Sequence, residues 1–367
     1  MKKIILLGLV MQLLVSCAGQ KLKTDLKAKQ DLKAVWNNQF IEDFNDTKAL
    51  DVLVVTNRKP KDQTFGCLEN SFDITNDKTL HFGTCKVNIP KNHSTGEISI
   101  ATEPSQSSHD YFKILDSKEL KEAEILDELK KAKNTPLVFV HGFNVKYQEA
   151  VLRAAQIAYD LKYQGPVVVF TWPAGASDGF FEEKFLNKTY AKNRNNARES
   201  TIQFRDFLLS LQRQDIKINL VVHSMGHQMV LPVLNFLASK KNEKTLISEL
   251  VLNAPDFDSA QFKKMAENIK NISDHVTLYC SYNDKAMIAS GIMNSSERLG
   301  ACAFMKDLDV INVSAIDDSA LGLGHGYYSS RDVLTDVFQA LLGIDAEKRL
   351  FMRKAEPNSA EKYFLRK

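Results

Sequence analysis

One serine of the sequence lies in a context that could make it a nucleophile. Ser224 follows a short run of β-branched apolar residues that starts at Ile218, and residues 230–239 after it have apolar side chains at helical spacing. A serine at a sharp turn between a buried strand and a helix presents its hydroxyl clear of the sheet, with helix N–H groups directly behind it. Gly226 is needed there because a side chain would collide with neighbouring backbone. The pattern predicts a nucleophile turn, although Val222 stands where such turns usually have glycine; a serine that merely caps the helix is the alternative.

A serine hydroxyl is a poor nucleophile at neutral pH, so it needs a base, a carboxylate that orients the base, and N–H donors for the oxyanion. In folds built around such a turn, the acid follows a later strand than the serine and the base comes last. We expect the acid to be Asp284, in S-Y-N-D-K after the seventh predicted strand. Asp256 and Asp258 follow the sixth predicted strand and are alternatives.

The base is expected to be His325, in the glycine-rich string G-L-G-H-G-Y-Y after the last predicted strand. Glycines on both sides would let the imidazole reach the serine. His227 lies one helical turn past Ser224 and is the competing histidine, although a base is not expected from that helix. His223 is next to the nucleophile along the chain, where its side chain should point away from it.

The string His141-Gly142-Phe143 directly follows the third predicted strand. This position predicts an oxyanion loop, in which the backbone N–H of Phe143 faces that of Met225, the residue after the nucleophile. The side chain of His141 is expected to be structural rather than catalytic.

Eight stretches are predicted to be strands because they are short, apolar and rich in β-branched residues. In chain order they are 51–56, 80–89, 136–140, 167–171, 218–223, 249–252, 276–280 and 310–313. The spacing of apolar residues predicts helices over 117–133, 145–162, 191–211 and 332–342. Strands alternate with helices from about residue 137, which requires a mainly parallel sheet with helices on both faces. We therefore expect one α/β domain over 50–345, with its catalytic parts in the α/β-hydrolase order.

Several strings together resemble those of an uncharacterised bacterial α/β-hydrolase family that is described only as esterase- or lipase-like. They are V-V-T-N-R-K at 54–59, F-G-T-C-K-V-N-I-P at 82–90, F-V-H-G-F-N at 139–144, F-T-W-P at 170–173, H-S-M-G at 223–226, N-A-P-D-F-D at 253–258, Y-N-D-K-A at 282–286 and G-H-G-Y-Y at 324–328. The resemblance implies the hydrolase fold and a triad of Ser224, Asp284 and His325, but it supplies no substrate. Two departures from the family bear on specificity. His227 stands where the family leads us to expect asparagine, and the segment 287–299 does not resemble the family.

The N-terminus is similar to a bacterial lipoprotein signal peptide. Two lysines precede an apolar stretch, 4–15, that is too short to span a membrane, and Leu14-Val15-Ser16-Cys17 follows. This ending implies removal of residues 1–16 and acylation of Cys17; an ordinary secretory peptide is the alternative. Because alanine and not aspartate follows Cys17, we expect a lipid anchor in the outer membrane of the cell envelope. The lysine-rich stretch 17–49 would then be an acylated spacer.

The four cysteines after Cys17 form two pairs that are close in sequence. In an exported protein an even count favours disulfides, and locality favours Cys67–Cys85 and Cys280–Cys302 among the three possible pairings. Four buried free thiols are the alternative. No C-x-x-C and no histidine pair has zinc-ligand spacing, so we expect neither a metal nor another cofactor.

The charge of the chain is nearly balanced. Removing the two lysines of the signal peptide lowers the formal net charge from +3 to +1. This balance excludes the basic footprint of a nucleic-acid-binding protein. Residues 347–367 carry seven Lys or Arg against three Glu, so a small basic solvated tail is expected over 346–367. The expected partners are a small-molecule or lipid ester and, through acylated Cys17, a membrane.

The first functional hypothesis is a serine hydrolase of carboxylic esters that forms an acyl-enzyme at Ser224. Amides and thioesters would use the same residues. The second is a membrane-anchored binding lipoprotein with little or no catalysis, which a complete set of catalytic residues disfavours. A further group of apolar residues could line an acyl pocket or a lid, although core packing is the commoner role: Phe180, Phe181, Phe185, Met287, Ile288, Ile292 and Met293.

Overall fold

The computed structural model describes residues 46–62, 64–176, 183–240, 245–303, 305, 308–316, 325–357 and 359–366, with 183–186 described by their backbone alone. Phe44–Leu161 and Gly165–Lys367 form one compact unit, which contains every helix and strand named in this section. The expected signal peptide, Cys17 and nearly all of the expected spacer lie outside the described residues.

The middle of the sheet is a run of parallel strands in the order β5-β4-β6-β7-β8-β9. They are β4 (Leu137–Val140), β5 (Val167–Thr171), β6 (Ile218–His223), β7 (Ile247–Asn253), β8 (Ser273–Cys280) and β9 (Asp309–Asn312). Every residue of β4, β5 and β6 is buried, as in strands that are covered on both faces. Because the strands are parallel, their carboxyl ends meet at one edge, where the loops that follow them can bring distant residues together.

The N-terminal part of this unit extends the sheet with a meander. β1 (Lys48–Pro60) is parallel to β5, β2 (Phe72–Ile89) is antiparallel to β1, and β3 (Lys113–Leu120) is antiparallel to β2. Two expectations are wrong here. β1 continues through Asn57–Pro60, with register shifts around Arg58. The first part of the predicted helix 117–133 is an edge strand, and only α2 (Glu122–Lys131) is helical.

The C-terminal residues extend the sheet at its other end. β11 (Tyr363–Leu365) is parallel to β9, and β10 (Met352–Lys354) is antiparallel to β11. Within the described residues the sheet therefore has 11 strands rather than the expected eight. The expectation of a solvated tail over 346–367 is wrong: Met352, Tyr363 and Leu365 are buried, and the charged neighbours of Met352 are exposed. β10 and β11 have only three residues each, which is too short for a strand pattern to be recognised in a basic stretch of sequence.

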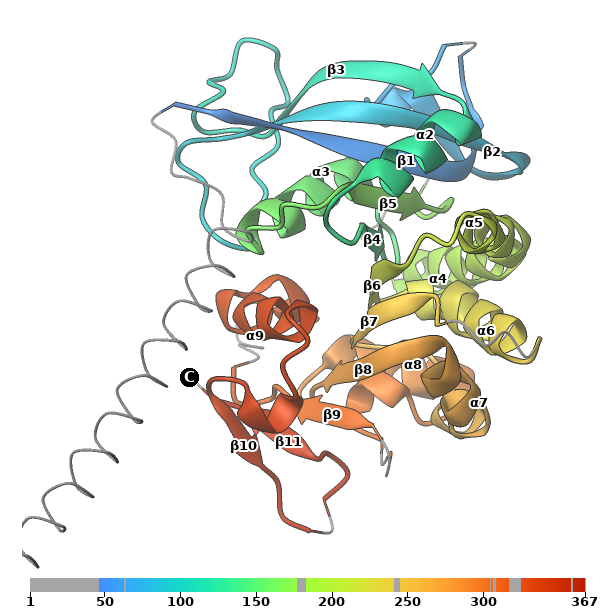
Figure 1. Ribbon diagram of the computed structural model, residues 1–367, viewed down its shortest axis with the longest axis vertical. Coiled ribbons are helices and arrows are strands. Elements are labelled where there is room, and N and C mark those ends of the chain that lie inside the picture. Colours follow the sequence, from blue (N-terminus) through green and yellow to red (C-terminus); the bar gives the residue numbers. More distant parts are fainter. Residues whose placement is uncertain are drawn as a thin grey trace, which may run out of the picture. The chain divides into compact units, whose positions relative to one another are not determined.

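Helices cover both faces of the sheet (Figure 1). α3 (Tyr147–Asp160) and α9 (Arg331–Leu341) lie on one face, and α5 (Thr201–Arg213), α6 (His227–Ala238) and α7 (Ser259–Ile272) lie on the other. The predicted helix 191–211 is two helices, α4 (Glu183–Glu199) and α5, which meet at the buried Ser200. The other helices in the described part of the chain are α8 (Lys285–Asn294) and the short 3₁₀ helices η1 (Glu69–Ser71), η2 (Ser224–Gly226), η3 (Leu299–Ala301), η5 (Tyr327–Ser329) and η6 (Ala346–Lys348).

The predicted α/β fold, a mainly parallel sheet with helices on both faces, is confirmed. Both predicted disulfides are present: Cys67–Cys85 joins the segment before η1 to β2, and Cys280–Cys302 joins the end of β8 to the residue after η3. Within the described ranges, no helix has the length and apolar character needed to cross a bilayer.

Candidate active site

Ser224 occupies a tight turn between β6 and α6. It is the first residue of η2 and has a φ of 51°, in the left-handed region. For a residue other than glycine this backbone costs on the order of 1–3 kcal/mol, and it persists only where surrounding packing imposes it. Gly226 shows how close that packing is, since an added Cβ would lie 2.7 Å from the carbonyl oxygen of His141. The turn aims the Ser224 side chain at the carboxyl edge of the sheet.

Three of the predicted site residues form one chain of hydrogen bonds. The Nε2 atom of His325 lies 2.7 Å from Ser224 Oγ, and its Nδ1 atom lies 2.7 Å from Asp284 Oδ2. With the imidazole proton on Nδ1, that nitrogen donates to the carboxylate and Nε2 accepts from the serine hydroxyl. This is the arrangement that activates a serine nucleophile.

The fold fixes the Asp284 carboxylate in place. Asp284 caps the N-terminus of α8, where its Oδ1 atom accepts the N–H of Met287 at 3.0 Å. Its side chain is 0% exposed, whereas that of His325 is 20% exposed. One carboxylate oxygen therefore holds the helix and the other holds the imidazole, so the orientation of His325 is coupled to the start of α8.

The two alternative acids do not contact His325. The buried Asp256 carboxylate accepts hydrogen bonds from Tyr190 Oη at 2.8 Å and from Ser290 Oγ at 2.5 Å, and it pairs with Arg298. Asp258 caps α7 by accepting the N–H of Gln261. Both aspartates therefore have structural partners of their own. The Tyr190–Ser290–Arg298 network was not predicted from the sequence, because its members are far apart along the chain.

His223 lies beside the base rather than away from the site. Its ring stacks on Tyr328 with centroids 3.7 Å apart, and its centroid is 4.9 Å from that of His325. Burial is the main cause that lowers the pKa of His223 well below its ordinary value, so the ring is neutral. His223 therefore packs against both Tyr328 and His325 and supports the segment to which they belong.

The predicted oxyanion loop packs directly against the nucleophile. An added Cβ on Gly142 would lie 2.9 Å from Ser224 Cβ, so the loop and η2 are in contact. Phe143 and Met225 are the next residues of these two segments. His141 itself is structural: its ring is parallel to that of Trp172, and its Nε2 atom is 3.0 Å from Thr171 Oγ1.

A buried arginine donates hydrogen bonds to the segments that flank the predicted oxyanion loop. Arg58 donates to Thr171 Oγ1 at 3.0 Å, to the carbonyl oxygen of Ala174 at 2.9 Å and to that of Val145 at 2.9 Å. Burial lowers the pKa of Arg58 to about 9, and it also lowers that of His141 to about 3, with the Arg58 charge as the second cause. Arg58 was not predicted to serve the site; its only signal was its place in the V-V-T-N-R-K string.

His227, the competing histidine, is turned towards the backbone. Its Nδ1 atom lies 2.7 Å from the carbonyl oxygen of Ser224, and its buried Nε2 atom has no hydrogen-bond partner among the described residues. Burial lowers the pKa of His227 from 6.5 to about 3. It therefore stays neutral and is not part of the hydrogen-bonded chain.

The buried neutral histidine predicts an acid-dependent loss of stability. The pKa of His227 is 6.5 in the unfolded chain and about 3 in the folded chain. Between these two pH values the unfolded chain therefore binds a proton at His227 and the folded chain does not. The free energy of unfolding should therefore fall as the pH drops through that window, by about 1.4 kcal/mol per pH unit for this one group. Urea unfolding at pH 7, 6, 5 and 4 should give a shallower decline for His227→Gln than for wild type. The surface variant His109→Gln is the control, and equal slopes for wild type and His227→Gln would contradict the assignment.

The disulfide at the end of β8 stands close to the acid. Cys280 is four residues before Asp284, and Ser281 N–H donates to the carbonyl oxygen of Gly300 in the segment that Cys302 closes. Replacing both cysteines by alanine should lower the free energy of unfolding by about 3 kcal/mol and should also lower kcat, because the Asp284 loop loses its covalent support. The matched control removes Cys67 and Cys85, which close a loop of similar length. Urea unfolding and ester hydrolysis would measure both; equal retention of kcat in the two variants would show that the β8 disulfide serves stability alone.

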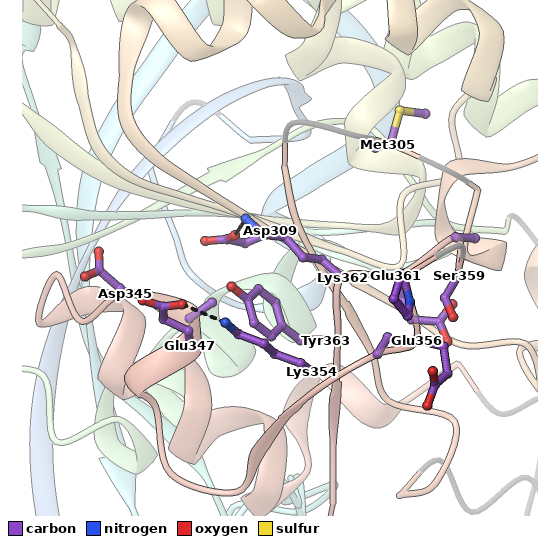
Figure 2. Close-up of a pocket in the computed structure, with 14 residues that line it drawn as sticks. Met305, Asp309, Asp345, Glu347, Lys354, Glu356, Ser359, Glu361, Lys362 and Tyr363 are labelled. Atoms are coloured by element: carbon purple, nitrogen blue, oxygen red, sulfur yellow. Dashed lines mark hydrogen bonds and ion pairs between the residues drawn. The ribbon is translucent and has the colours of Figure 1, made fainter.

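A hollow of about 720 Å³ lies at the hairpin of β10 and β11. Ser224, Asp284 and His325 do not line it. Figure 2 shows its charged lining, including the ion pair of Lys354 with Glu347. A second lysine, Lys362, pairs with Asp309. No histidine lines this hollow, so the hydrogen-bonded chain at the carboxyl edge of the parallel strands is the better candidate site. Within the described residues, no group of three or more His, Cys, Asp or Glu side chains could hold a metal ion.

The apolar residues suggested for an acyl pocket lie in two places. Met287 is buried, whereas Ile288, Ile292 and Met293 are exposed on α8. The side chains of Phe180, Phe181 and Phe185 lie outside the described part of the chain.

The fold is that of an α/β-hydrolase, and the candidate site residues follow its chain order: a serine after β6, an acid after β8 and a histidine after β9. The family model described as "Alpha/beta hydrolase of unknown function (DUF900)" matches residues 117–344, and the chain belongs to that family. The expected membership of an uncharacterised α/β-hydrolase family is thereby confirmed. The comparisons with curated proteins and with solved structures give no match.

Proposed function

We propose that this α/β-hydrolase is a serine hydrolase of carboxylic esters and that Ser224, His325 and Asp284 are its catalytic triad. The observation that carries the proposal is the unbroken hydrogen-bonded chain from the buried Asp284 carboxylate through His325 to Ser224 Oγ, with 2.7 Å at each step. The left-handed backbone of Ser224 supports it, because strain of this kind is found where the position of a side chain matters.

In the proposed reaction, Ser224 Oγ attacks the ester carbonyl carbon while His325 Nε2 takes the hydroxyl proton. The carbonyl electron pair moves to the oxygen, which the N–H groups of Phe143 and Met225 stabilise. The tetrahedral intermediate then expels the alcohol, whose oxygen receives the proton from Nε2. Water attacks the remaining acyl-enzyme with His325 again as the base, which releases the acid and restores Ser224.

A series with one acyl group tests the ester assignment. 4-Nitrophenyl butyrate should be hydrolysed. The 4-nitroanilide of butyric acid should react at least about 100-fold more slowly, because its nitrogen must be protonated by His325 before it can leave. Faster turnover of the anilide would make the protein an amidase. Failure to hydrolyse either compound, or the butyryl thioester, would favour the binding lipoprotein.

We further propose that Cys17 carries acyl chains that anchor the protein to the outer membrane. The support is the lipobox-like sequence that ends at Cys17, together with the alanine that follows it. In fractionated cells that make the full chain, Cys17→Ser should move the protein out of the membrane fraction. Retention of the variant in the membrane would exclude the anchor.

A further inference from the structure

A cavity of about 170 Å³ lies between α3 and the segment that carries His325, and Tyr328 of that segment lines it. One wall is formed by Val145 and by Glu149 and Arg153 of α3, which are spaced four residues apart. The loop between β2 and β3 contributes Ile98 and Ile100, and the wall is completed by His141 and Tyr328. The lining is thus apolar on the loop side and charged on the α3 side.

Two of the lining residues connect the cavity to the reacting groups, each through one intervening residue. Tyr328 stacks on His223, and the His223 ring lies 4.9 Å from that of His325. His141 precedes Gly142, whose Cα is so close to the nucleophile that an added Cβ would be 2.9 Å from Ser224 Cβ. Tyr328 and His223 therefore lie between the cavity and the base, while His141 connects the cavity to the predicted oxyanion loop.

Arg153 brings unused hydrogen-bond donors to this cavity. Its Nη1 atom donates to the carbonyl oxygen of Gly96 at 2.9 Å and to Gln156 Oε1 at 2.6 Å, and its guanidinium carbon lies 5.8 Å from the centre of the Tyr328 ring. Among the described residues, no carboxylate forms an ion pair with it, and Nε and Nη2 have no acceptor. Glu149, the acidic residue of the same wall, accepts the N–H of Lys146 at the start of α3. A guanidinium with free donors is suited to a carboxylate or a phosphate.

The opposite wall is held in place before any ligand arrives. His93 Nε2 lies 2.7 Å from Asp160 Oδ1, and Gly96 N–H donates to Asp160 Oδ2 at 2.8 Å. The side chains of His93 and Asp160 are only 5% and 2% exposed. Since these contacts fasten the loop of Ile98 and Ile100 to α3, the cavity is preorganised, and little ordering is needed when a ligand binds.

We propose that this cavity binds the alcohol part of the ester and that Arg153 selects small alcohols that carry an anionic group. The inference rests on the proposed function, in which His325 returns its proton to the leaving oxygen, so the alcohol must lie on the His325 side. A volume of 170 Å³ is below the roughly 300–1,000 Å³ of pockets for drug-sized ligands. It holds a short carboxylate- or phosphate-bearing alcohol, whereas a lysolipid with a long chain does not fit. The substrate class is therefore a soluble ester with an anionic alcohol.

Three butyrate esters that form the same acyl-enzyme test this proposal: O-butyrylglycolate with an anionic alcohol, ethyl butyrate with a neutral one and butyrylcholine with a cationic one. Since deacylation is common to all three, differences in kcat/KM report on the acylation step. Arg153→Gln should lower kcat/KM for O-butyrylglycolate by about tenfold or more, the value of a charge-assisted hydrogen bond, and should leave that for ethyl butyrate within about twofold. Arg153→Lys, which keeps the charge, should retain part of the preference. Because each variant is compared with wild type on the same ester, the intrinsic reactivity of that ester cancels.

Arg205→Gln on α5 is the matched control, because it removes an arginine outside the cavity. Equal losses for the anionic and the neutral ester in Arg153→Gln would overturn the proposal, since they would mean damage to the fold or to the triad. So would an unchanged preference in Arg153→Gln, or failure of wild type to hydrolyse any of the three esters while Ser224 still reacts with a fluorophosphonate. If Ser224 does not react with that reagent at all, the proposed function itself fails.

Discussion

His325→Ala is expected to lower kcat for a short-chain ester by about 10,000-fold or more, because loss of the base leaves the Ser224 hydroxyl protonated and unreactive. KM should change little, since the imidazole acts in the transition state rather than in ground-state binding. Steady-state hydrolysis of 4-nitrophenyl butyrate with purified protein measures both constants, and circular dichroism verifies the fold.

The matched control for His325 is His227, the competing histidine on α6. His227→Gln keeps a side-chain donor for the Ser224 carbonyl oxygen that His227 Nδ1 now contacts, so it should affect kcat far less than His325→Ala. The reverse order of effects would assign the base to α6 and would contradict the proposed role of His325.

Asp284→Asn is expected to have the second largest effect, again a loss of about 10,000-fold in kcat. An amide at this position would present its NH₂ group or a neutral oxygen to His325 Nδ1, and the charge that stabilises the imidazolium would be gone. Asparagine is also a good helix cap, so α8 should still form. A thermal melt close to that of wild type would show that the loss arises from the chemistry and not from unfolding.

Asp256→Asn separates the two candidate acids. This carboxylate pairs with Arg298 in a buried network, so its replacement should cost stability while activity at low temperature is largely kept. Parallel measurement of kcat and of urea unfolding for both aspartate variants distinguishes the roles. An inactive but stable Asp256→Asn protein, with an active Asp284→Asn protein, would move the acid to the loop after β7.

Parts of the fold and site were predictable because their signals are local or follow chain order. β4, β5 and β6 are fully buried and appear in the sequence as short apolar runs. Ser224 and His325 could be proposed because a nucleophile turn and a glycine-rich segment after the last strand are recognisable without tertiary contacts. Asp284 required only the count of strands before it.

The remaining features depend on contacts between distant segments. The edge strand β3 is mostly exposed and charged, so its residues look like one face of a helix until β2 is placed beside it. The strands of the C-terminal tail are three residues each and need β9 as a partner. Arg58 and the Asp256–Arg298 pair are buried charges, which hydrophobic periodicity cannot reveal because it places charged residues at the surface.

The most direct test of the central claim is the reaction of the intact protein with a fluorophosphonate, followed by mass spectrometry of the peptides. The hydrogen-bonded chain ending at Ser224 Oγ predicts one adduct per chain, located on Ser224, and no adduct in Ser224→Ala. A wild-type protein that remains unmodified, or a label that persists at another residue in Ser224→Ala, would contradict it.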